Sequence, residues 1–264
     1  MNEKTLTYNE YDVYYYTNDL NKKETVLFLH PAFSDHTAFV DQFDSLSDQF
    51  NLITLDMIGH GKTQPKKTTD DIEATIQHMK DILTENHLKT CHIVGVSLGS
   101  LVAQGFAEKH PDITKSVTVV GGYSIHNYNQ DILKAQQKAI FKVLFRIIFN
   151  MNSLRRYVSK ISTYHKHAYE RFYSSSKSYT RKSLKYMQGM QKIFHQTKEK
   201  IPYPLLIVYG EHDLDIGKNH AKLWHKQIPE SKLHIVEDAG HCVNMEQPEK
   251  FDLILLDFIE NLRP

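Results

Sequence analysis

The sequence predicts an α/β fold: a mostly parallel central sheet flanked by helices, with an all-helical cap insertion. Short apolar segments that favour strands alternate with segments of helical periodicity. The strand-like segments are mostly apolar instead of alternating with polar residues, which is typical of parallel strands buried on both faces. A long middle stretch has helical periodicity and no strand pattern.

Six segments carry the strand pattern, and several run into turns that contain glycine, proline or aspartate. They are residues 25–30 (TVLFLH), 51–56 (NLITLD), 90–96 (TCHIVGV), 115–120 (KSVTVV), 204–209 (PLLIVY) and 232–236 (KLHIV). Helices are predicted over residues 70–86, 98–109 and 248–262, and Pro111 ends the second of them. Because strands and helices alternate, helices should cover both faces of the sheet.

The middle stretch, about residues 123–200, differs from the rest in charge as well as in periodicity. It holds 16 Lys and Arg residues and three acidic ones, a net charge of +13. The whole chain carries +1, so the remainder carries −12. We interpret this stretch as a helical cap inserted into a single α/β domain that spans residues 1–264.

The most specific local motif is GVSLG at residues 95–99, between a predicted strand and a predicted helix. A serine on a tight strand-to-helix turn projects its hydroxyl at the carboxyl end of the strand. The flanking glycines let neighbouring backbone segments pass closely. The helix N-terminus places N–H groups beside the position of a developing oxyanion. Ser97 is therefore the candidate nucleophile.

In this setting the motif resembles the nucleophile turn of the α/β-hydrolase family. The resemblance covers about residues 24–122 and 202–262, and it implies the chain order nucleophile, acid, histidine. His241, at the end of the segment DAGH, lies after the last predicted strand and before the last helix, where the family keeps its catalytic histidine. Serine needs a neighbouring base to take its proton, and the resemblance implies His241.

The acid that orients the histidine should follow the preceding strand. Residues 210–213 read GEHD and resemble the family's G-x-x-D, which implies Asp213. Its carboxylate would accept a hydrogen bond from the imidazole and fix the tautomer. Asp215 is the alternative, and Glu211 is less favoured by register.

A tetrahedral intermediate needs two N–H donors. One is expected from the backbone of Leu98, directly after the nucleophile. The resemblance implies Ala32 as the second, because the family usually has His-Gly-x where this chain has His30, Pro31 and Ala32. The proline stiffens this loop without removing the Ala32 donor, and Phe33 is the alternative donor.

Residues 56–61 (DMIGHG) resemble a further family turn, D-x-x-G-x-G. We interpret it as structural, with glycines in a tight turn near the site. His60 is expected to pack or to form hydrogen bonds and not to act in catalysis.

The reaction implied is hydrolysis of a carboxylic ester, or a related acyl compound, through an acyl-enzyme, as in carboxylesterases. Relatives with this constellation also open lactones, cleave carbon–carbon bonds in dienoic acids or make peracids. A small-ligand receptor or regulatory binding protein with little turnover is the alternative from another class. Serine at position 97 argues against dehalogenases and epoxide hydrolases, which use aspartate. No cofactor or metal is expected, since the chain has no CxxC or HExxH motif.

The basic cap allows three interpretations: a solvated helical face, a surface that draws an anionic substrate, or weak association with an anionic membrane surface. In the last case residues 140–149 would be the apolar face, although they could instead line an acyl pocket. No nucleic-acid-binding module is recognisable, and the sequence does not indicate an oligomeric state.

The chain starts without a signal-like segment, and no apolar run reaches the roughly 20 residues that span a bilayer. With only Cys91 and Cys242, it has no disulfide framework, so a cytoplasmic location is expected.

Overall fold

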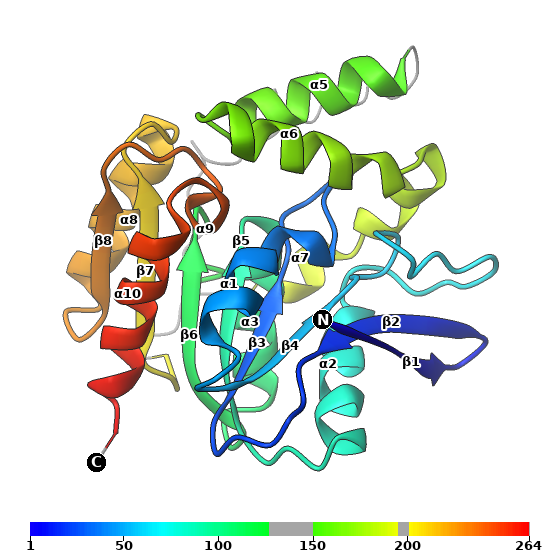
Figure 1. Ribbon diagram of the computed structural model, residues 1–264, viewed down its shortest axis with the longest axis horizontal. Coiled ribbons are helices and arrows are strands. Elements are labelled where there is room, and N and C mark those ends of the chain that lie inside the picture. The colour runs from blue at the N-terminus through cyan, green and yellow to red at the C-terminus, as the bar shows by residue number, and fades with distance from the viewer. Residues whose placement is uncertain (127–149, 195–200, 264) are drawn as a thin grey trace.

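The computed structural model describes residues 1–126, 150–194 and 201–263. Its centre is an eight-stranded sheet with the order β1-β2-β4-β3-β5-β6-β7-β8 (Figure 1). All six predicted strands are present and pair in parallel: β3 (Thr25–Leu29), β4 (Asn51–Leu55), β5 (Cys91–Val96), β6 (Thr114–Val120), β7 (Leu205–Gly210) and β8 (Lys232–Val236). The predicted α/β class with a mostly parallel sheet is therefore confirmed.

Two further strands, which the sequence pattern did not predict, extend the sheet at one edge. β1 (Asn2–Tyr8) and β2 (Tyr11–Thr17) form an antiparallel hairpin, and β2 pairs antiparallel with β4. Asn9 in the two-residue turn has a φ of 50°, a conformation that asparagine tolerates better than most residues. The outer strand β1 is largely exposed and carries charged side chains, which discourage pairing with another sheet edge.

The three predicted helices are present, with α2 (Ala74–Glu85) four residues shorter at its start than expected. The others are α3 (Leu98–Lys109) and α10 (Pro248–Glu260). The late start of α2 follows from a turn in which Asp71 accepts the amides of Glu73 and Ala74. Four further elements were not predicted: η1 (His36–Phe39), α1 (Val40–Leu46), α8 (Asp215–Gln227) and α9 (Val243–Glu246).

Successive residues of the parallel strands face two separate apolar cores, one on each side of the sheet. Val26 and Phe28 pack with α1 and α10, whereas Leu27 and Leu29 pack with α2, α3 and α8. Figure 1 shows α1 and α10 on the near side of the sheet and α3 behind it. Both faces of the strands are thus buried, as their apolar composition predicts.

The described part of the predicted cap contains only helices and turns. These are α5 (Met151–Ser162), α6 (Lys166–Ser175), η2 (Ser176–Ser178), η3 (Arg181–Met187) and α7 (Met190–Ile193). Figure 1 shows α5 and α6 above the upper, carboxyl end of β6. The apolar run 140–149, with the rest of 127–149 and 195–200, lies outside the described residues. Within the described ranges, no helix is both long enough and apolar enough to cross a bilayer.

Candidate active site

Ser97 lies on a sharp turn between β5 and α3. Its backbone has φ 52° and ψ −113°, a strained conformation for a residue with a side chain, at a cost of about 1–3 kcal/mol. A Cβ on Gly95 would lie 2.4 Å from the Gly99 carbonyl oxygen, and one on Gly99 would lie 2.2 Å from that of Leu29. The glycines therefore let α3 start directly against β5 and β3, with Ser97 partly exposed at the strand end.

The structure brings Asp213 and His241 together, 28 residues apart in the chain. Nδ1 of His241 lies 3.1 and 3.0 Å from the two carboxylate oxygens of Asp213. The Asp213 side chain is only 3% exposed and that of His241 is 21% exposed, so a buried carboxylate holds an imidazole that is partly open to solvent. Because this contact uses Nδ1, Nε2 is the ring nitrogen that could accept a proton.

Gly121 places the His241 ring beside the nucleophile turn. With φ 60°, it follows β6, and a Cβ there would lie 2.7 Å from Nδ1 of His241. The amide of Ser97 donates to the carbonyl of Val120, the residue before Gly121. Three segments therefore meet at the carboxyl ends of the parallel strands: the turn after β5, the turn after β6 and the histidine loop. A glycine pair after a predicted strand was the only sequence signal for this contact.

Two opposing effects set the pKa of His241. Burial lowers the pKa of the imidazole, while the charge of Asp213 and its hydrogen bond raise it. The charge and the hydrogen bond of Asp213 together outweigh burial, so the pKa of His241 lies above its ordinary value. Asp213 therefore stabilises the imidazolium form, which is the form that would arise if His241 took a proton from a serine.

The alternative acids lie away from the imidazole. The side chain of Asp215 is 90% exposed and pairs with Lys218, the next turn of α8. Glu211 accepts the amide of Asp238 at 3.1 Å. The geometry thus favours Asp213 over both alternatives.

The two expected oxyanion donors lie on adjoining segments. α3 begins at Leu98, and Gly99 packs against the last residue of β3, from which the loop to Ala32 leaves. In the part of the chain that the structure describes, neither the Leu98 nor the Ala32 amide donates a hydrogen bond. Both donors are therefore free for an oxyanion. The alternative donor, Phe33, adopts φ 68° in the same turn.

His30 fixes the start of this loop. Its Nδ1 donates to the carbonyl of Pro31 at 2.9 Å, and its Nε2 accepts the amide of Met57 at 3.0 Å. Burial lowers the pKa of His30 to about 4, so the ring stays neutral and keeps one donor and one acceptor nitrogen.

Buried hydrogen bonds hold the turn at residues 56–61, for which a structural role is expected. The buried carboxylate of Asp56 accepts the amides of His36 and Lys62 and the Nδ1–H of His36. Gly61, with φ 48°, is required because a Cβ there would overlap that carboxylate. His60 is fully buried, its Nδ1 donates to the Ile58 carbonyl, and burial lowers its pKa to about 3.

No group of three side chains that could hold a metal ion occurs within residues 1–126, 150–194 and 201–263. Both cysteines are buried and free. Burial raises the pKa of the Cys91 thiol to about 12, which removes its thiolate character at neutral pH.

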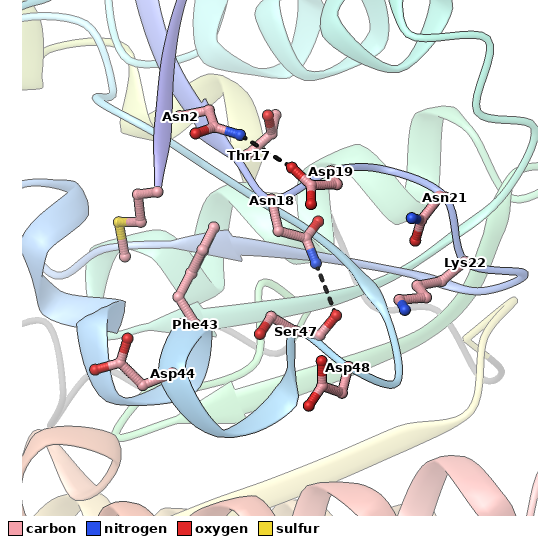
Figure 2. Close-up of a pocket in the computed structure, with 11 residues that line it drawn as sticks. Asn2, Thr17, Asn18, Asp19, Asn21, Lys22, Phe43, Asp44, Ser47 and Asp48 are labelled. Atoms are coloured by element: carbon pink, nitrogen blue, oxygen red, sulfur yellow. Dashed lines mark hydrogen bonds between the residues drawn. The ribbon is translucent and has the colours of Figure 1, made fainter.

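A separate hollow of about 390 Å³ lies between β2 and α1, beside the N-terminus (Figure 2). Its lining is polar and includes Asp19, Asp44, Asp48 and Lys22. Its lining includes none of the predicted site residues, so it is separate from the candidate site.

The chain is similar to several known proteins over most of its length. It is 25% identical over 240 residues to the dihydrolipoyllysine-residue acetyltransferase component of an acetoin cleaving system from Cupriavidus necator, covering 88% of this chain and 62% of that one. It is 24% identical to a 2-hydroxy-6-oxononadienedioate/2-hydroxy-6-oxononatrienedioate hydrolase from Pseudomonas, covering 90% and 89%. A thermophilic esterase from Thermogutta terrifontis superposes with a TM-score of 0.81 over 99% of both chains, at 17% identity.

The last of these similarities shows the shared fold. The family model described as serine aminopeptidase, S33, matches residues 21–248, which include the serine turn and the histidine loop. The chain therefore belongs to this family of α/β hydrolases.

Proposed function

We propose that this α/β hydrolase cleaves carboxylic esters of small molecules through a covalent acyl-enzyme on Ser97. The observation that carries the proposal is the contact between buried Asp213 and Nδ1 of His241, at the carboxyl ends of the strands, where the strained Ser97 turn also lies. This arrangement supplies a nucleophile, a base and an orienting acid in the order that serine hydrolases of this fold use.

The reaction follows from these positions. Ser97 Oγ attacks the ester carbonyl while Nε2 of His241 takes its proton, and Asp213 stabilises the resulting imidazolium. The amides of Leu98 and Ala32 donate to the tetrahedral oxyanion. When the intermediate collapses, the imidazolium protonates the departing alcohol. A water molecule then attacks the acyl-enzyme, with His241 again taking and returning the proton.

A series of p-nitrophenyl esters of increasing chain length tests the proposal. Wild type should show turnover with an optimum chain length. In Ser97→Ala the turnover rate should fall on the order of 10⁴-fold or more. Asp215→Asn serves as the control because that exposed carboxylate pairs with Lys218 and does not contact His241. Equal turnover by wild type and Ser97→Ala would disprove a serine mechanism.

Cleavage of a carbon–carbon bond in a dicarboxylic dienoic substrate is the second candidate. One relative is described as a hydrolase of such substrates. Residues 150–194 of the cap hold ten Lys and Arg residues and one acidic residue, a charge balance that would attract a dianion. Steady-state kinetics would distinguish ester hydrolysis from carbon–carbon bond cleavage. Carbon–carbon cleavage requires kcat/KM for a dienedioate to exceed kcat/KM for every neutral ester.

A further inference from the structure

The proposed reaction requires two loops to keep a fixed position relative to each other: the loop that carries His241 and the loop that carries Ala32. Both are bonded to the same cap segment, one at each end of α6. We propose that Glu246 and Ser175 are positioning residues that fix these two loops to opposite ends of α6, so that the helix acts as a brace between base and oxyanion donor. The proposal rests on the function assigned above.

At its first end, α6 is fixed to the histidine loop by a buried carboxylate. Glu246, 3% exposed, accepts the amide of Tyr164 at 2.6 Å and the amide of His165 at 3.0 Å, just before α6 begins. These N–H groups have no partner within the helix, so the carboxylate also compensates the helix terminus.

The residues on both sides of His241 touch this same segment. The amide of Cys242 donates to the carbonyl of Ser162 at 3.1 Å. A Cβ on Gly240 would lie 2.9 Å from the amide nitrogen of Tyr164, so the two backbones are in direct contact. Any shift of the first end of α6 therefore moves the backbone of His241.

At its second end, α6 is fixed to the oxyanion loop. The buried hydroxyl of Ser175 lies 2.9 Å from that of Ser34, which closes the turn containing Ala32 by donating its amide to Pro31. Three residues on, the Ser178 hydroxyl lies 3.1 Å from Oδ2 of Asp35. The ring of Phe33 also packs edge-on against Tyr179, with centroids 4.8 Å apart.

The brace couples two sites that would otherwise be independent. Ten helical residues separate the ends by about 15 Å, a distance at which substitutions normally act additively. If one rigid helix sets both loops, a change at either end must reach the other.

Amide hydrogen exchange tests this coupling without relying on turnover. The variants are Glu246→Gln, Ser175→Ala and the double variant. Glu170→Gln is the matched control, because Glu170 lies on the exposed side of α6 and, among the described residues, pairs with Lys166 at 3.7 Å. Glu246→Gln should raise exchange at residues 34–38 by about tenfold, and Ser175→Ala should do so at residues 242–247. Exchange that rises only at the substituted end would overturn the proposal.

Ester kinetics on the same variants give the second readout. Glu246→Gln should lower kcat/KM by about 10–100-fold, mainly through kcat, because a displacement near 1 Å has that effect. The double variant should lose clearly less than the product of the single losses, whereas agreement with that product to within about twofold would refute a shared brace. If wild type turns over no ester but exchange is coupled between the ends, the brace stands and the proposed esterase function fails.

Discussion

At the scale of single residues, the proposed chemistry depends on one contact, that between Asp213 and His241. The sequence indicated Asp213 and His241 but left Asp215 and Glu211 open as alternative acids. Register along a loop does not determine which carboxylate turns inward. The structure favours Asp213 because it is buried at hydrogen-bond distance from Nδ1, while the other two acids are exposed.

Replacing Asp213 by Asn should change both the rate and its pH dependence. The amide cannot hold the tautomer with Nδ1 protonated, so kcat should fall on the order of 10⁴-fold. Asp213 raises the pKa of His241, so its removal should lower that pKa. Since kcat/KM requires neutral His241 and falls as the pH drops through its pKa, the acid limb should move to lower pH. A pH–rate profile checks this, with Asp215→Asn expected to match wild type.

The sequence did not single out two residues that lie at the site, Gly121 and Glu246. Gly121 follows a predicted strand like many turn glycines, and only its φ of 60° and its contact with the His241 ring show its role. Glu246 lies on a four-residue helix that the sequence pattern did not predict. Its importance comes from the cap backbone it binds, 81 and 82 residues away in sequence.

At the scale of elements, the six parallel strands were predictable because burial on both faces requires continuous apolar runs. The β1–β2 hairpin was not, since an exposed edge strand has no such requirement and β2 is rich in tyrosine. Short elements such as α1 and α9 carry too few residues for a periodic pattern to stand out.

Two glycines of α3 differ in what an added Cβ would contact, so their alanine variants compare the cost of a clash with backbone against the gain in helix propensity. A Cβ on Gly99 would meet the Leu29 carbonyl oxygen at 2.2 Å, whereas one on Gly105 would meet side-chain methyls, the Cγ2 of Ile193 at 2.8 Å and the Cδ1 of Ile76 at 3.1 Å. Gly99→Ala should therefore destabilise the fold by at least about 2–3 kcal/mol, as overpacking against backbone does. Gly105→Ala should cost far less, because alanine favours the helix by about 1 kcal/mol. Urea unfolding of both variants tests the difference, and equal losses would contradict it.

At the scale of the whole molecule, buried histidines link stability to pH. Burial lowers the pKa values of His30, His78 and His92 to about 4 and that of His60 to about 3. Each ring is neutral when folded, whereas the unfolded chain takes up protons below about pH 6.5.

Because the unfolded state then binds more protons, the free energy of unfolding should fall as the pH drops from about 6.5 toward 4. Each unit of pKa difference is worth about 1.4 kcal/mol, so the four rings together should lose on the order of several kcal/mol by pH 5. Urea unfolding at pH 7.5, 6 and 5 measures this. A free energy of unfolding that stays constant over that range would show that the rings are not buried in the neutral form.

The proposed reaction requires Ser97 as the nucleophile, and labelling with a fluorophosphonate tests this role most directly. Intact mass should show one added phosphonyl group on wild type and none on Ser97→Ala, with peptide mapping placing the adduct on the segment that contains residue 97. An adduct on Ser97→Ala, or its absence from folded wild type, would contradict the central claim.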